Sequence, residues 1–250
     1  MGLVPFAPWK TQAGFRVRFE WGLSGLLALL DDLAGVAVVD VLRFSTAVET
    51  ATTNGVTVFP WASEDGSPLA WAEEVGAVVA DAWSLDRPSL SPESLARLPQ
   101  GSRVVLPSPN GATCVVASAR AGVPTAAACL RNAAAVAAWL ERVDGPVAVI
   151  ACGERHEDGS LRPSLEDMLG AGAVLSGLSG DLSPEASATT AVWRMMGPHA
   201  DMVLSQCASG RQLIDRGRAD DVAWAACCDV SDTVPHLAGR AFQPAPPAPA

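Results

Sequence analysis

The stretch that most constrains this chain lies at residues 36–46, where an apolar run changes abruptly into polar residues. Five of its first six residues are apolar, which is typical of a strand buried on both faces of a parallel sheet. Asp40, Arg43, Ser45 and Thr46 interrupt or follow the run, and a helix is expected from Ala47. Open α/β sheets bind ligands at such strand ends, where Arg43 and helix amides suit an oxyanion and Asp40 suits a cation. The alternative is that Asp40 and Ser45 only cap the helix.

Composition narrows the class of protein. The 250 residues, 49% of them apolar, can bury a sizeable core. A formal net charge of −10 argues against nucleic-acid binding, because no basic surplus exists to neutralise phosphates. No signal peptide and no membrane-length apolar run is apparent. Six cysteines without C-x-x-C spacing fit neither a zinc site nor a disulfide framework, so a reduced cytoplasmic protein is expected.

Strand and helix patterns alternate along the chain and predict a three-layer α/β/α fold with a mostly parallel or mixed sheet. Residues 15–21 alternate in polarity and predict a half-buried strand of the kind found at a sheet edge, while 222–227 are interpreted as a last strand. We expect one domain over 1–242. The Pro/Ala-rich residues 243–250 predict a disordered tail.

Polar residues recur where the predicted strands end. In a parallel sheet these carboxyl ends converge on one edge, so together they favour a site, although each alone is more often a cap. The residues concerned are Asp40, Arg43, Ser45, Ser108, Asn110, Gly111, Asn132, Cys152 and Gly153, with Glu166 and Asp167 one loop later.

Two nucleophilic cysteine chemistries can be tested against the sequence. Cys114 to Arg120 matches a C-x5-R spacing, but the intervening residues predict helix core rather than a phosphate loop, and this reading is rejected. Cys152 follows a strand and remains a candidate nucleophile, with a buried, inert thiol as the favoured interpretation.

The ordered motifs resemble the 2-phosphosulfolactate phosphatases of coenzyme M biosynthesis. They stand at residues 39–46, 109–113, 132, 164–173, 209–211 and 229–235. The resemblance covers roughly residues 35–240 and implies a magnesium-dependent phosphatase with an α/β fold. The chain departs from the family pattern at 87–92, which lacks the Asn of a Gly-Asn-Ser-Pro segment, and in a charged insertion at 154–162.

Charge chemistry, read with this resemblance, assigns the roles. Mg²⁺ prefers carboxylate oxygens, and adjacent helix residues point about 100° apart, so one of Glu166 and Asp167 is expected to join Asp40 as a ligand. The predicted metal ligands are Asp40, Glu166 and Asp167. The predicted catalytic residues are Asp40, Arg43, Asn110 and Glu166. The predicted substrate- and phosphate-binding residues are Ser45, Asn110, Gly111, Asn132, Ser209 and Arg211. Arg155 and Arg162 are expected to matter much less than Arg43.

Two functions remain open. The first is a Mg²⁺-dependent phosphatase acting on a small anionic phosphate ester. The second is a non-catalytic protein with the same fold, either a small-anion binding protein or a regulatory protein. Asp40, Glu166 and Asp167 favour the first, because a pure anion binder does not need carboxylates beside its site. The expected partner is a small phosphorylated anion, with no nucleic acid and no membrane. The exact substrate, the attacking group and a homodimer stay open.

Overall fold

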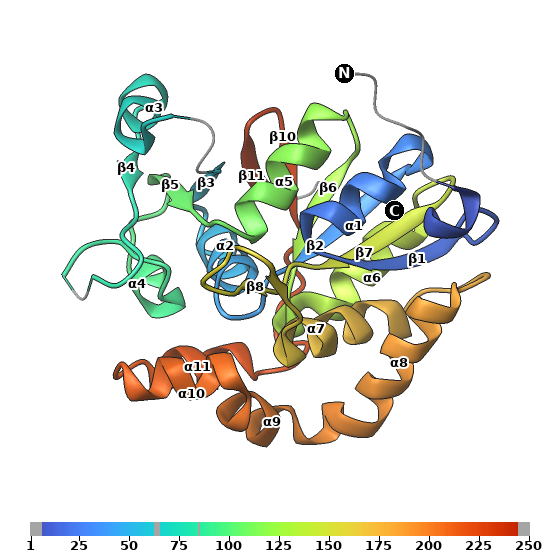
Figure 1. The fold of residues 1–250 in the computed structure, drawn as a ribbon. Coiled ribbons are helices and arrows are strands. Elements are labelled where there is room, and N and C mark those ends of the chain that lie inside the picture. Colours follow the sequence, from blue (N-terminus) through green and yellow to red (C-terminus); the bar gives the residue numbers. More distant parts are fainter. Residues whose placement is uncertain (1–6, 63–65, 85, 245–250) are drawn as a thin grey trace.

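The computed structural model describes residues 7–62, 66–84 and 86–244. In this part of the chain nine strands form one mixed sheet, with helices on both of its faces (Figure 1). The predicted α/β class with a mixed sheet is confirmed. The strand order is β1-β7-β2-β6-β10-β11-β3-β5-β4, and β8 and β9 form a separate hairpin.

The strands are β1 Val17–Trp21, β2 Gly35–Val39, β3 Thr57–Trp61, β4 Val78–Val79, β5 Arg103–Pro107, β6 Thr125–Ala128, β7 Val147–Ala151, β8 Glu154–Arg155, β9 Leu161–Arg162, β10 Pro235–Ala238 and β11 Ala241–Pro244. The helices are α1 Gly22–Leu29, α2 Phe44–Thr53, α3 Pro68–Val75, α4 Pro92–Ala96, α5 Gly111–Arg120, α6 Ala133–Glu141, α7 Leu165–Ser176, α8 Pro184–Met196, α9 Ala200–Gln206, α10 Ala208–Asp215 and α11 Ala219–Ala225.

Strand β2 is buried on both faces, as its apolar run predicts. Val36 and Val38 pack into a core with α1, α2 and α5. Ala37 and Val39 pack into a second core with α6 and α7. Parallel neighbours β7 and β6 flank the strand on either side. Asp40 therefore follows a strand that is buried on both faces and paired along both edges.

The sheet has two parallel parts, β1-β7-β2-β6 and β3-β5-β4, joined by the antiparallel hairpin β10–β11. Single bridges, His236 with Ala126 and Phe242 with Val58, connect the hairpin to the two parts. This hairpin was not predicted, and it corrects the boundary of the expected tail, because Gln243 and Pro244 belong to β11. Residues 245–250 of that tail lie outside the described residues.

Residues 222–227, interpreted above as a last strand, lie instead in and just after helix α11. Asp221, Val222 and Ala225 are buried, at the spacing of one helix face. Asp220 and Asp221 occupy the first turn, where the helix dipole favours acidic side chains. A short apolar run cannot by itself distinguish a buried helix face from a strand, which explains the error.

Strand β1 lies at the edge of the sheet, as predicted, but its polar face is not exposed. Arg18 is 1% exposed, and its Nη1 donates to Asp32 Oδ1 at 2.6 Å. In the described part of the chain, no helix is long and apolar enough to cross a membrane.

Candidate active site

Asp40 lies at the carboxyl end of β2, and each of its oxygens accepts hydrogen bonds. Oδ1 accepts the amide of Phe44 at 3.2 Å in the first turn of α2. Oδ2 accepts the amide of Gly111 at 3.0 Å and the hydroxyl of Ser108 at 3.4 Å. Ser108 and Gly111 follow β5 in the other parallel part of the sheet, so Asp40 joins the two parts.

Gly111 begins α5, and its lack of a side chain lets α5 approach Asp40. A Cβ atom there would lie 2.3 Å from Phe44 Cδ1 and 2.8 Å from Asp40 Oδ2. The Gly111 amide, predicted to bind phosphate, donates instead to Asp40 and to Ser108 Oγ. Asn110 stands at the N-cap position of the same helix without a side-chain capping hydrogen bond, lines the pocket described below and is half-buried.

Glu166 and Asp167 occupy the first turn of α7 and differ in their partners. Asp167 accepts the amide of Val41 at 2.7 Å and the amide of Gly153 at 2.8 Å, one at each oxygen. Glu166 is 2% exposed, yet its Oε2 is buried without any hydrogen-bond partner. Of the two neighbours, Glu166 is therefore the one with an uncommitted oxygen.

The three carboxylates interact electrostatically. Burial raises the pKa of Asp40 to about 6, and the charge of Glu166 adds to this rise, while the amides of Phe44 and Gly111 oppose it. Burial, followed by the charges of Asp40 and Glu166, raises the pKa of Asp167 well above its usual range. A bound cation would offset the mutual repulsion of these carboxylates.

These groups share one small pocket of about 140 Å³. Residues from the segments that follow β2, β5 and β7 and from α7 and α10 meet there, although they are far apart in the sequence. Its polar lining includes Asp40, Arg43, Ser108, Asn110, Glu154, Glu166, Asp167, Ser209 and Gln212.

Arg43 lines this pocket, but its charge is already paired. Its Nη1 donates to Asp221 Oδ2 at 2.7 Å, and both side chains are 4% exposed. Its Nη2 donates to the carbonyl of Ala82, and the guanidinium lies 4.7 Å from the ring centroid of Trp83. Arg211, the other predicted anion-binding arginine, is exposed and does not belong to the pocket lining.

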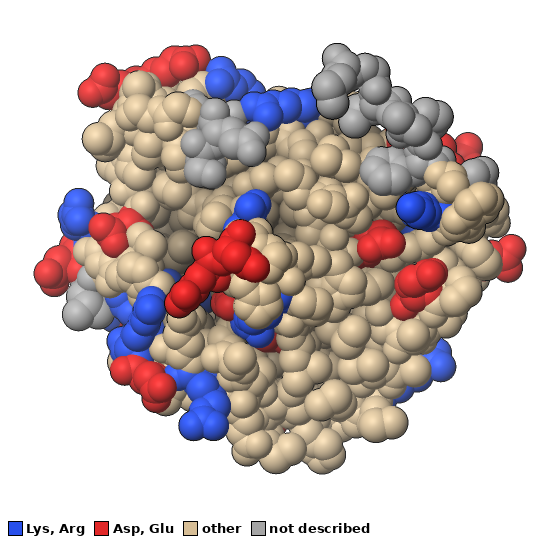
Figure 2. All heavy atoms as spheres, viewed as in Figure 1, with Lys and Arg blue, Asp and Glu red and all other residues tan. Residues whose placement is uncertain are grey.

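The hairpin β8–β9 brings a positive charge, that of Arg162, to the pocket, although Arg162 was expected to matter much less than Arg43. Arg162 donates to Ser209 Oγ at 2.7 Å and to Glu154 Oε2, and both partners line the pocket. Figure 2 shows acidic and basic side chains together at this hairpin. The signal in the sequence was the charged insertion 154–162 itself, but nothing local showed that it folds back onto α10.

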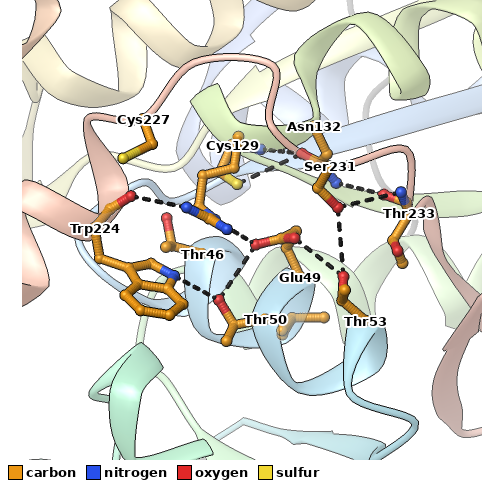
Figure 3. Close-up of polar contacts among 12 residues, drawn as sticks. Thr46, Glu49, Thr50, Thr53, Cys129, Asn132, Trp224, Cys227, Ser231 and Thr233 are labelled. Carbon is orange, nitrogen blue, oxygen red and sulfur yellow. Dashed lines mark hydrogen bonds and ion pairs between the residues drawn. The ribbon is translucent and has the colours of Figure 1, made fainter. Parts of the chain in front are cut away.

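Two predicted binding residues have structural partners instead. Ser45 is fully buried, where its hydroxyl accepts the amide of Asp40 and donates to the carbonyl of Val38. Asn132 is also fully buried, and Figure 3 shows its side chain among Cys129 and Thr233. It lies outside the pocket lining.

A polar cluster around Glu49 fixes α2 against the C-terminal segment (Figure 3). Glu49 is fully buried and pairs with Arg131 at 2.8 Å. Arg131 donates to the carbonyl of Trp224, whose indole donates to Thr50 Oγ1 at 3.0 Å. Because Trp224 belongs to α11, this cluster also holds Asp221 near Arg43.

Neither of the two candidate cysteines has the surroundings of an activated nucleophile. Cys114 lies within α5, so the C-x5-R reading fails, as expected. Burial raises the pKa of the Cys152 thiol well above its usual range, and the neighbouring Cys114 adds to the rise. A thiolate is therefore disfavoured there. All six cysteines are free.

The carboxylates of this pocket are few for a metal site made of protein ligands alone. Within residues 7–62, 66–84 and 86–244, no group of three or more His, Cys, Asp or Glu side chains is arranged to hold a metal. Mg²⁺ does not require three, because it usually takes one or two carboxylates together with waters and substrate oxygens. Glu166 Oε2 has no hydrogen-bond partner, and the charges of Glu166 and Asp40 both raise the pKa of Asp167. The oxygen therefore fits such a ligand set.

Comparison with known proteins identifies the family of this chain. The sequence model of a family described as 2-phosphosulpholactate phosphatase matches residues 28–240. A probable 2-phosphosulfolactate phosphatase of Thermus thermophilus is 29% identical over 213 residues, which cover 82% of this chain and 88% of the relative. A protein of the same name from Carboxydothermus hydrogenoformans is 28% identical over 214 residues, covering 80% and 85%. The matched range includes every residue placed in the pocket, and the chain belongs to the 2-phosphosulpholactate phosphatase family.

Proposed function

We propose that this protein is a Mg²⁺-dependent phosphatase that hydrolyses a small anionic phosphate ester, with 2-phosphosulfolactate as the first candidate. The observation that carries the proposal is the buried, unpartnered Glu166 Oε2 beside two carboxyl groups of raised pKa. Such a cluster is costly until a cation binds it. Family membership supports the phosphatase class.

Asp40 and Glu166 are the residues that would hold the metal, with Asp167 beside them. Each oxygen of Asp40 and of Asp167 already accepts a backbone amide, so Glu166 is the carboxylate of the three that has an oxygen free for direct contact. Bound there, Mg²⁺ would offset the carboxylate charge that otherwise repels a phosphate ester, and would polarise a phosphoryl oxygen.

The remaining groups would bind and orient the ester. Arg162 and Ser209 form a hydrogen-bonded pair at the pocket, and a charged donor of this kind suits an anionic oxygen. Asn110 lines the same pocket and offers a side-chain amide. A pocket of about 140 Å³ suits a small ester better than a large one, since pockets for drug-sized ligands exceed roughly 300 Å³.

The test is a hydrolysis assay with 2-phosphosulfolactate and a generic aryl phosphate, each with Mg²⁺ and with excess chelator. We expect turnover that needs the metal, and faster turnover of 2-phosphosulfolactate. Full activity in chelator would remove the metal from the proposal. Faster turnover of other phosphorylated hydroxy acids would retain the phosphatase class but change the substrate.

A matched pair of variants separates catalysis from anion binding alone. Glu166→Gln removes one charge from the pocket, whereas Glu157→Gln removes one from an exposed position in the β8–β9 hairpin. Activity should fall in the first variant only. If the wild-type protein binds the ester tightly but turns over none of it, the non-catalytic binding function is correct instead.

A further inference from the structure

A second and larger cavity lies away from the active site. It has a volume of about 440 Å³ and is enclosed by β3, α3, the C-terminal half of α5 and the turn between β10 and β11. Its lining includes Trp61, Trp71, Val116, Leu237, Arg120 and Arg240. No residue belongs to both this lining and that of the active-site pocket. Its volume is within the range of small-molecule sites.

Trp61 carries a hydrogen-bond donor that has no partner. Its indole Nε1 is buried, and only one other buried side-chain nitrogen or oxygen in the described part of the chain lacks a partner, namely Glu166 Oε2. A buried donor left unpaired costs free energy that an acceptor would recover. The N–H is inaccessible to solvent, so the indole contributes its apolar ring, and not this donor, to the cavity.

Arg240 places a positive charge on the same cavity. Its guanidinium lies 3.3 Å from the ring centroid of Trp71. Its ion pair with Glu74 is exposed on both sides and therefore weak enough to yield to a ligand. In Figure 2, basic side chains lie along the upper rim, where Figure 1 places the β10–β11 turn and the end of α5. The described lining contains no Asp or Glu.

We propose that this cavity is a second ligand site, which binds a small planar aromatic anion. Two indoles with Val116 and Leu237 offer flat and apolar surface for a ring. The guanidinium of Arg240 offers donors for its carboxylate, sulfonate or phosphate group. A ligand with only a ring would offer no acceptor to the guanidinium of Arg240, and a ligand with only a charge would leave the apolar surface uncovered.

The test is calorimetric titration of the full chain, in chelator, with naphthalene-2-sulfonate. A sulfonate is not a phosphate ester, so turnover does not complicate the measurement. 2-Naphthol supplies the ring without the charge, and methanesulfonate the charge without the ring. We expect the aromatic sulfonate to bind at least about tenfold more tightly than either. Equal affinity for all three probes, or no binding at millimolar concentration, overturns the proposal.

Variants locate the binding. Trp61→Leu removes an aromatic ring from the lining, and Arg240→Gln removes the charge; each should weaken binding about tenfold. Arg103→Gln is the matched control, because Arg103 is exposed and lies over Phe59 outside the cavity. If the first two variants bind like wild type, the site is elsewhere and the proposal fails. Trp71→Leu replaces Trp61→Leu if circular dichroism shows that the latter misfolds. Aryl phosphate hydrolysis should be unchanged in all of them.

Discussion

Arg43 and Asp221 form a buried ion pair although 178 residues separate them in the chain. Nη1 of Arg43 lies 2.7 Å from Oδ2 of Asp221, whose other oxygen accepts the hydroxyl of Ser91 at 2.6 Å. Burial tends to lower the pKa of Arg43, and Asp221 opposes that effect. The pair ties the loop after β2 to α11, and thus one wall of the active-site pocket to the C-terminal helices.

Removing one partner of this pair should destabilise the fold. Arg43→Ala leaves Asp221 as a buried charge without its counterion, and a loss of about 3–5 kcal/mol in the free energy of unfolding is typical. Urea unfolding of Arg43→Ala, Asp221→Ala and the double variant measures it. The double variant should lose clearly less than the sum of the two single losses. Strictly additive losses would show that the two side chains do not interact in solution.

Arg162→Ala should impair catalysis more than Arg155→Ala, contrary to the sequence-based expectation that both matter little. Arg162 contacts Ser209 at the pocket, whereas Arg155 is exposed and donates to the carbonyl of Pro109. Loss of a hydrogen bond to a charged oxygen should lower kcat/KM by roughly 10- to 100-fold. Steady-state kinetics with the same ester measures both variants, and equal effects would remove Arg162 from substrate binding.

Glu166→Gln should uncouple stability from metal binding. The change costs no hydrogen bond at Oε2, which has none, and it removes one of three neighbouring charges. In chelator the Tm should be equal to or above that of wild type, while the affinity for Mg²⁺ falls at least about tenfold. A thermal melt and a Mg²⁺ titration on one preparation measure both. A lowered Tm with unchanged metal affinity would assign Glu166 a structural role.

The stability of the metal-free protein should depend on the titration of Asp40. Its pKa rises from 3.8 to about 6 on folding, so the folded state binds the proton more tightly than the unfolded chain. The resulting stabilisation is present at low pH and is lost as pH rises through about 6, by an amount on the order of 3 kcal/mol. Asp40→Asn lacks this titration.

Unfolding in chelator between pH 4 and pH 7 checks the sign. The free energy of unfolding of wild type, relative to Asp40→Asn, should decrease as pH rises across this range. Both proteins share every other titrating group, and the change also relieves the effect of the Asp40 charge on the pKa of Asp167, so the difference reports Asp40 together with this coupling. A difference that stays constant with pH would show that Asp40 has the same pKa in the folded and the unfolded protein.

Much of the local structure and the centre of the site could be predicted from the sequence. The apolar run of β2 identified a doubly buried strand, and Asp40 lies at its end. Asn110 and Glu166 were expected at helix starts on the same edge, and they line one pocket with Asp40. These features follow from residue periodicity and capping, which act over a few residues along the chain.

The partners of these residues were decided only by the tertiary structure. The hairpin β10–β11 enters the middle of the sheet through single bridges, and α11 brings Asp221 to Arg43. The hydrogen-bonding groups of a residue do not show which partners it will have. The sequence could not show that the Ser45 hydroxyl bonds to the backbone, or that Arg162 bonds to Ser209. A polar side chain becomes a ligand or a structural bond according to which distant segment packs against it. That choice depends on burial and close packing across the whole fold, and not on the sequence beside the residue.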